Sequence, residues 1–255
     1  MGRVAVFDSG LGSLSIIMAI RKVTKAEIIY FADQKHYPYG KKSSSQLRQI
    51  IESSIKLLKK KFNPDVIVVG SNTPTILFED LFMDKAIIGV SPPLSKAIKI
   101  TKTKSIAILA TSTTINSSQL DRFIANNVPT NISVIKIDAT KLIDLVETGK
   151  FLNDVSYCKN KIPKYLCNEF SSKNIDVVTL SSTHLSFLNS ILTEMFPTIS
   201  FLDPALDVAK QITKMRNFSP SQKNSLKIFS SSNTTQLQNH LSKLKIKNTV
   251  QHLEF

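Results

Sequence analysis

The sequence predicts an α/β protein whose β-sheets are mostly parallel. Short apolar runs rich in β-branched residues alternate along the chain with longer amphipathic segments. Continuous apolar strands separated by helices are typical of parallel sheets that are covered on both faces. The chain has 255 residues, 42% of them hydrophobic, which is enough for one large domain or for two small α/β domains with separate cores.

We predict β-strands where short apolar runs have the length of buried strands. These runs cover residues 4–7, 28–31, 66–69, 86–89, 106–110, 133–137, 177–180, 226–229 and 249–253. The stretch 43–61 is typical of the helices predicted between them. Its apolar residues recur at roughly helical spacing, at Leu47, Ile50, Ile51, Ile55, Leu57 and Leu58.

Two pairs of similar segments suggest an internal duplication. VAVFDSG at 4–10 is similar to IAILATS at 106–112, and VIVVGSNT at 66–73 is similar to VVTLSSTH at 177–184. Each segment is an apolar strand that ends in small polar residues. Ligands of open parallel sheets bind beyond the carboxyl ends of the strands. Two similar domains that face each other would therefore bring the polar ends together around one cleft.

Composition excludes several classes of protein. No stretch reaches the roughly 18 consecutive apolar residues that a membrane span needs. The first residues run directly into a strand-like segment without a secretory signal, so we expect a cytoplasmic protein with no membrane partner. Cys158 and Cys167 lie in one predicted helix, too far apart for a disulfide, and we expect two ordinary buried thiols. No Cys/His cluster is present, so we expect no metal site.

The net charge of +14 raises the question of a nucleic-acid partner. The lysines are scattered, with short runs at 41–42 and 59–61, and no aromatic residues are interleaved with these runs. This pattern favours a solvated, Lys-rich surface over a nucleic-acid site, while a functional basic patch stays open. The positive field would also attract a small acidic substrate.

Four short motifs carry the polar chemistry of the chain. Taken singly, each fits a helix cap or a turn. Taken together, they define a candidate site at the ends of the predicted strands. The motifs are Asp8-Ser9-Gly10, Pro38-Tyr39-Gly40, Ser71-Asn72-Thr73 and Ser182-Thr183-His184.

The order and spacing of these motifs resemble the glutamate racemase family, part of the aspartate/glutamate racemase superfamily, over nearly the full chain. Further matching segments are FDSGLGSL at 7–14, YFADQKHYPYG at 30–40 and LVETG at 145–149. The resemblance implies two similar flavodoxin-like α/β domains with the active site in the cleft between them. We expect residues 1–95 plus 207–255 to form the first domain and residues 96–206 the second. The resemblance implies no cofactor and is compatible with a homodimer.

The family racemises its substrate with two cysteines on opposite faces, one removing the α-proton while the other returns a proton. The resemblance places these roles at Ser71 and Ser182. It implies that Asp8 and His184 tune the proton exchange of the side chains at these two positions, and that Glu147 supports His184. A serine hydroxyl has no appreciable alkoxide population near neutral pH, whereas a general base should have its pKa near the working pH. Two-thiol racemisation is therefore not available to this chain.

The resemblance also implies a cradle for a small acidic amino acid, either glutamate or aspartate. Backbone N–H groups at helix starts suit the carboxylates of such a ligand. The lining residues implied by the family are Asp8, Ser9, Tyr39, Gly40, Asn72, Thr73, Thr114, Thr183 and His184.

Several interpretations of the two serines stay open. They are an engineered pair, a natural homologue that has lost racemisation, or a site with different chemistry in which His184 or Asp8 is the base. Differences from the family at Ser13, Pro92 and Ser181 favour natural divergence, because an engineered pair would leave its neighbours unchanged. The leading hypothesis is an isomerase-family protein with impaired activity. The alternatives are a non-catalytic binding or interaction protein and a serine-dependent hydrolase or lyase, although no G-x-S-x-G motif is present.

Overall fold

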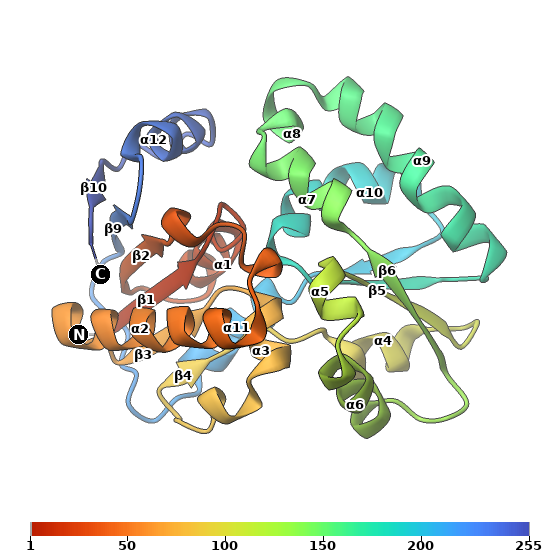
Figure 1. The fold of residues 1–255 in the computed structure, drawn as a ribbon, viewed down its shortest axis with the longest axis horizontal. Helices are drawn as coiled ribbons and strands as arrows, with labels where there is room; N and C mark the ends of the chain where they lie inside the picture. Colours follow the sequence, from red (N-terminus) through yellow and green to blue (C-terminus); the bar gives the residue numbers. More distant parts are fainter. Residues whose placement is uncertain (1, 255) are drawn as a thin grey trace.

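The computed structural model describes residues 2–254, and its strands form two β-sheets flanked by helices (Figure 1). Every strand pairing within these residues is parallel. The predicted fold class, α/β with mostly parallel sheets, is therefore confirmed. None of the helices in residues 2–254 combines the length and the hydrophobicity needed to cross a bilayer.

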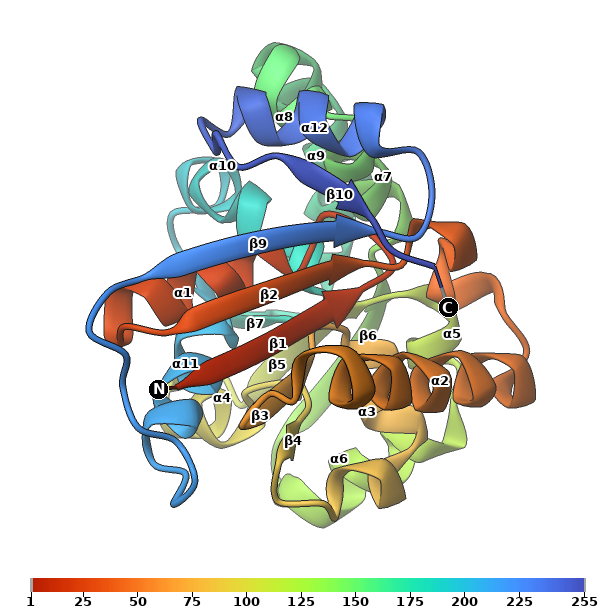
Figure 2. The same cartoon turned by 90° about the vertical axis from the view of Figure 1, so that its left-hand side faces the viewer.

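The first sheet has the strand order β10-β9-β2-β1-β3-β4. Its central strand β1 alternates between two cores, with Val4 and Val6 on the side of helices α1 and α11 and Ala5 and Phe7 on the side of α2. Figure 2 shows α2 in front of the sheet and α1 behind it. Because both faces are covered, the strands can be apolar throughout. The strands are β1 (Arg3–Asp8), β2 (Glu27–Ala32), β3 (Val66–Val69), β4 (Ile87–Ile88), β9 (Ser225–Ser230) and β10 (Val250–His252).

The second sheet has the order β6-β5-β7-β8, which repeats the order β2-β1-β3-β4 of the first. The two pairs of similar segments found in the sequence thus occupy equivalent strands, β1 with β5 and β3 with β7. All strands of this sheet come from residues 105–202, whereas those of the first sheet come from residues 3–88 and 225–252. The division into residues 1–95 plus 207–255 and residues 96–206 stays a prediction, and we call these two parts the halves of the protein. The strands are β5 (Ser105–Ala110), β6 (Ser133–Asp138), β7 (Val177–Leu180) and β8 (Ser200–Leu202).

Helix α2 begins and ends at recognisable signals. Helix α2, predicted at 43–61, begins after Ser43, which forms a capping box with Gln46, and it ends at Asn63 in the left-handed region (φ 42°). The α-helices are α1 (Leu14–Val23), α2 (Ser44–Phe62), α3 (Asn72–Leu77), α4 (Leu94–Ile100), α5 (Ser112–Ile115), α6 (Ser118–Asn127), α7 (Thr140–Glu147), α8 (Lys150–Asn153), α9 (Val155–Ser172), α10 (Asn189–Met195), α11 (Ala205–Thr213) and α12 (Thr234–Lys243). The 3₁₀ helices are η1 (Gln34–His36), η2 (Tyr39–Lys41), η3 (Glu79–Phe82) and η4 (Thr183–Leu188).

The structure corrects three details of the sequence-based prediction. Strand β8 was not predicted, because its three residues lie at a sheet edge and none of them is fully buried. Strand β4 is only two residues long. Both cysteines lie in α9 as expected, but only Cys158 is buried, whereas Cys167 is exposed on the opposite side of the helix.

Candidate functional site

The predicted polar motifs meet in one small cavity of about 50 Å³ between the two halves of the protein. Asp8 ends β1, Ser71 follows β3 and Ser182 follows β7, so all three lie beyond the carboxyl ends of parallel strands. The cavity is lined by Asp8, Ser9, Tyr37, Pro38, Tyr39, Gly40, Ser71, Asn72, Thr73, Thr111, Ile143, Ser181, Ser182 and His184.

Ser71 and Ser182 occupy equivalent positions in the two halves. Each is an extended residue directly before a helix, with φ −138° and ψ 132° for Ser71 and φ −147° and ψ 132° for Ser182. Neither hydroxyl caps its helix. Both side chains are therefore available to the cavity, one from each half of the protein.

His184 lies between Ser182 and Glu147. Its Nδ1 is 3.4 Å from the Ser182 hydroxyl oxygen, and its Nε2 is 2.5 Å from the carboxylate of Glu147. Glu147 also accepts a hydrogen bond from the backbone N–H of Leu11 at 2.7 Å. The hydrogen bond between Leu11 and Glu147 joins the loop after β1 in the first half to α7 in the second.

The pairing sets the charge of His184 and Glu147. Burial alone would lower the pKa of His184, but the hydrogen bond and charge of Glu147 outweigh it and hold the pKa above its usual value. Burial alone would raise the pKa of Glu147, but the hydrogen bond and charge of His184 hold it below its usual value. At pH values between the lowered pKa of Glu147 and the raised pKa of His184, the two side chains therefore form a buried imidazolium–carboxylate ion pair.

Asp8 is buried close to this pair. Its carboxylate accepts a hydrogen bond from the backbone N–H of Ser9 at 2.7 Å, and the Thr183 hydroxyl lies 3.4 Å away. Burial raises the pKa of Asp8 from 3.8 to about 7, against the opposing effect of the nearby positive charge of His184. Asp8 can therefore exchange a proton near neutral pH, which is a property expected of functional sites.

The side-chain amide of Asn72 is buried and lines the cavity, yet neither its oxygen nor its nitrogen has a hydrogen-bond partner within residues 2–254. A buried polar group without a partner costs roughly 1–3 kcal/mol. A ligand that offers both a donor and an acceptor at this point would remove that cost.

Three threonine hydroxyls connect the two halves beside the cavity. Thr73 of the first half lies 3.0 Å from both Thr111 and Thr114 of the second, and these two lie 2.9 Å apart. The Thr113 hydroxyl also donates a hydrogen bond to the carbonyl of Gly40. These contacts hold the cavity closed.

The structure brings together most of the residues predicted for the site. Asp8, Ser9, Tyr39, Gly40, Ser71, Asn72, Thr73, Ser182 and His184 all line the cavity. Thr114 lies behind Thr73 and Thr111, Thr183 donates a hydrogen bond to the carbonyl of Gly70 at 3.0 Å, and Glu147 lies behind His184. Thr114, Thr183 and Glu147 therefore do not line the cavity themselves but form hydrogen bonds just behind it.

Tyr37, Thr111, Ile143 and Ser181 also line the cavity, although none of them was predicted as a site residue. Tyr37 lies inside the segment 30–40 that resembles the family, and Thr111 lies in the segment 106–112 that is similar to 4–10, so both carry a sequence signal. Ile143 carries no sequence signal, because it faces the cavity only through the packing of α7.

Glycines let the loop after β1 approach the ion pair. A Cβ atom added at Gly10 would collide with the Glu147 carboxylate, and one added at Gly12 would collide with Thr183 and lie 2.6 Å from Nδ1 of His184. The two glycines of the sequence Gly-Leu-Gly therefore set the close contact between the halves.

A second cavity of about 380 Å³ adjoins the first and shares Ser9 and Tyr37 with it. Asp144 and Glu147 line it from the second half of the protein, and Asn233 and Gln236 line it from the first half. Within residues 2–254, no group of three or more His, Cys, Asp or Glu side chains is arranged to hold a metal ion.

Solved structures share this two-sheet fold. The structure of a glutamate racemase isoform from Bacillus anthracis has a TM-score of 0.87 at 22% identity and covers 100% of this chain and 98% of its own. That of the Escherichia coli glutamate racemase, in complex with L-glutamate and the activator UDP-MurNAc-ala, has a TM-score of 0.86 at 22% identity and covers 99% and 98%. The chain therefore has the fold of these glutamate racemase structures.

Comparison with known sequences identifies the family to which the chain belongs. The glutamate racemase of Clostridium botulinum (strain Alaska E43 / Type E3) is 30% identical over 219 residues, which are 83% of this chain and 82% of that protein. That of Clostridium perfringens (strain ATCC 13124) is 29% identical over 199 residues, or 75% and 74%. No protein-family model matches the chain. The chain belongs to the glutamate racemase family.

Proposed function

We propose that the cleft binds a small acidic amino acid, glutamate or aspartate, and that it does not racemise this ligand by the two-thiol reaction. The observation that carries the proposal is the presence of Ser71 and Ser182 at the two equivalent strand ends that face the cavity. A serine hydroxyl is too weakly acidic to supply an α-proton base near neutral pH. The rest of the polar site is assembled around these two hydroxyls.

The surroundings of Ser182 also argue against a serine nucleophile. An activated hydroxyl needs a neighbouring base that can accept its proton. Because Glu147 raises the pKa of His184, the imidazole keeps its second proton to higher pH than an ordinary histidine, and in that protonated form Nδ1 donates and cannot accept. The 3.4 Å separation between Nδ1 and the hydroxyl is also long for a catalytic hydrogen bond. These facts favour binding over serine-dependent hydrolysis.

The polar groups of the site suit an amino acid. The unpartnered amide of Asn72 can both donate to a carboxylate and accept from an ammonium group. Asp8 and His184 both line the cavity, and once Asp8 ionises, near pH 7, they can offer an ammonium group and a carboxylate partners of opposite charge. The E. coli relative, whose structure contains L-glutamate, supports the choice of ligand class.

The closed cavity of about 50 Å³ is smaller than typical ligand pockets, which measure roughly 300–1,000 Å³. The adjoining cavity of about 380 Å³ supplies room on the side of Tyr37 and Ser9. Binding therefore requires movement of the Tyr37 segment or loosening of the threonine contacts between the halves.

Isothermal titration calorimetry with L-glutamate, D-glutamate and L-aspartate tests the proposal. We expect at least one of them to bind, and we expect Asn72→Ala to weaken binding roughly tenfold, because it removes hydrogen bonds worth about 1–3 kcal/mol to a charged ligand. Asn127→Ala, which changes an exposed asparagine at the end of α6, is the matched control and should leave affinity unchanged. Absence of binding by all three amino acids, or equal affinity in the Asn72 variant, would refute the proposal.

A further inference from the structure

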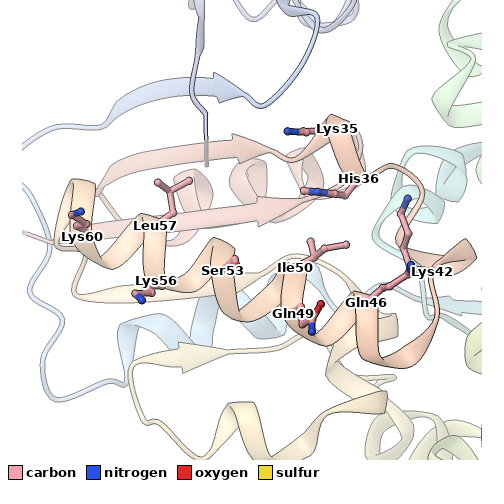
Figure 3. A pocket seen from close by; sticks show the side chains of 10 residues that line it. All are labelled: Lys35, His36, Lys42, Gln46, Gln49, Ile50, Ser53, Lys56, Leu57 and Lys60. Atoms are coloured by element: carbon pink, nitrogen blue, oxygen red, sulfur yellow. The ribbon is translucent and has the colours of Figure 1, made fainter.

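A groove of about 680 Å³ runs along the outer face of helix α2, and none of its lining residues belongs to the cleft (Figure 3). Side chains from α2 form one side, and Lys35 and His36 of the η1 segment form the other. Ile50 and Leu57 provide an apolar floor between polar side chains. We call this feature the α2 groove.

Four lysines line the α2 groove, namely Lys35, Lys42, Lys56 and Lys60. Within residues 2–254 none of the four forms an ion pair, whereas Lys59 on the neighbouring face of the same helix pairs with Asp84 at 2.8 Å. The lining contains no acidic side chain among the described residues.

Two acidic side chains that are close in sequence to the lining are already engaged. Glu52 of α2 pairs with Arg48 at 2.9 Å, and the buried Asp33 lies 2.8 Å from Nδ1 of His36. The positive charge of the four lysines is therefore not balanced by neighbouring side chains. A groove lined by charge of one sign concentrates ligands of the opposite sign.

The lysines are spread along the groove rather than gathered at one point. Lys42 lies just before α2, and from Ser44 to Lys60 the helix advances about 24 Å at the rise of an α-helix. Lys56 and Lys60 are one turn apart, or about 6 Å along the axis. A single phosphate or carboxylate can contact only one or two of these ammonium groups, whereas a linear anion with closely repeated charges can contact all of them.

The other lining side chains distinguish between kinds of linear anion. Single-stranded nucleic acids are bound by basic grooves that also offer aromatic side chains for base stacking. Apart from the His36 imidazole, the described lining has no ring, and its remaining polar groups are Gln46, Gln49 and Ser53, which can donate hydrogen bonds to phosphate oxygens. We propose that the α2 groove binds a linear inorganic polyphosphate chain, a ligand unrelated to the amino acid of the cleft.

Fluorescence anisotropy with labelled long-chain polyphosphate tests this proposal, with unlabelled tripolyphosphate, ATP and a mixed-sequence single-stranded oligonucleotide as competitors. The long chain should bind more tightly than tripolyphosphate and ATP, because only the long chain reaches from Lys42 to Lys60. Its affinity should fall steeply with salt. An oligonucleotide that binds more tightly than polyphosphate would overturn the proposal in favour of a nucleic-acid site, and equal affinity for ATP would assign the groove to a nucleotide.

Charge-reversal variants locate the site. The double substitution Lys56→Glu and Lys60→Glu should weaken polyphosphate binding at least tenfold. The matched control is the pair Lys164→Glu and Lys210→Glu, which changes net charge equally at exposed positions on α9 and α11. It should weaken binding less than threefold. Circular dichroism checks that both variants fold, and equal losses in the two variants would show that binding follows net charge and not the groove.

Discussion

Glu147→Gln is expected to destabilise the protein by about 3 kcal/mol near pH 5.5, the cost typical of removing one partner from a buried ion pair. Glutamine keeps the size of the side chain and an oxygen that can accept the hydrogen bond from Leu11. The substitution therefore removes the charge that faces His184 while leaving the packing in place. Urea denaturation followed by circular dichroism measures the effect.

The pH dependence of this loss identifies its cause. The raised pKa of His184 gives stability that is fully present below the unfolded value of 6.5 and is lost as pH rises through the folded value. The lowered pKa of Glu147 gives stability that is present above 4.5 and is lost as pH falls. The difference between wild type and variant should therefore be largest between these two values and should shrink in alkaline solution.

The matched control is Glu169→Gln, which removes an exposed ion pair between Glu169 of α9 and Lys173, the residue that follows this helix. Exposed pairs contribute about 0–1 kcal/mol, so this variant should remain close to wild type at every pH. If Glu147→Gln cost the same at pH 5.5 and in alkaline solution, charge pairing with His184 would not be the reason for its effect.

Asp8→Asn is expected to stabilise the protein above neutral pH. The folded pKa of Asp8 is raised from 3.8 to about 7, so the wild-type protein loses stability as pH rises between these values, because a buried carboxyl must ionise. At about 1.4 kcal/mol for each pH unit, the full effect approaches about 4 kcal/mol. Asparagine has nearly the same shape and can still accept the hydrogen bond from Ser9.

Thermal unfolding measured from acid to alkaline pH tests this expectation. The variant and wild type should have similar melting temperatures near pH 4, and the variant should melt on the order of 10 °C higher above pH 7. Asp121→Asn, which alters an exposed aspartate paired with Lys136, should produce no such trend. A variant that is less stable than wild type at alkaline pH would contradict the buried, proton-holding state of Asp8.

Two parts of the polar site are expected to reduce the stability of the fold, in contrast to the stabilising pair of His184 and Glu147. Asp8 is buried with a raised pKa, and the Asn72 amide is buried without a partner. Polar groups held in this way at the expense of stability are typical of sites that bind or transform a ligand.

Much of the fold could be predicted because buried strands appear in the sequence as short, continuous apolar runs. The segments 66–69 and 177–180 are continuous runs of buried residues and were predicted with the observed bounds of β3 and β7. Strand β8 was missed because an edge strand of three half-exposed residues has no such run. The equivalence of β1 with β5 and of β3 with β7 could be suspected from short similar segments, but strand order was needed to establish it.

The site was predictable where its residues lie in motifs at strand ends, as Asp8, Ser71 and Ser182 do. The hydrogen bond between His184 and Glu147 joins residues 37 positions apart and could be expected only from the family resemblance. Ile143 was beyond sequence reasoning. Lys42 and Lys60 lie in the short basic runs at 41–42 and 59–61, but the gathering of four lysines along one groove could not be predicted. These positions depend on how α7 and α2 pack, and Lys35, Lys42, Lys56 and Lys60 are not contiguous in the sequence.

Proton exchange at the α-carbon of glutamate tests the central claim most directly. The wild-type protein and the double variant Ser71→Cys, Ser182→Cys are each incubated with L-glutamate in deuterated water. Loss of the α-proton signal in NMR spectra and the change in optical rotation are then followed. We predict that the wild-type protein shows no exchange, whereas the double variant, with two thiols restored in the same cavity, exchanges the proton with inversion. Exchange with inversion by the wild-type protein would contradict the account, because it would show that the two serines do not prevent racemisation.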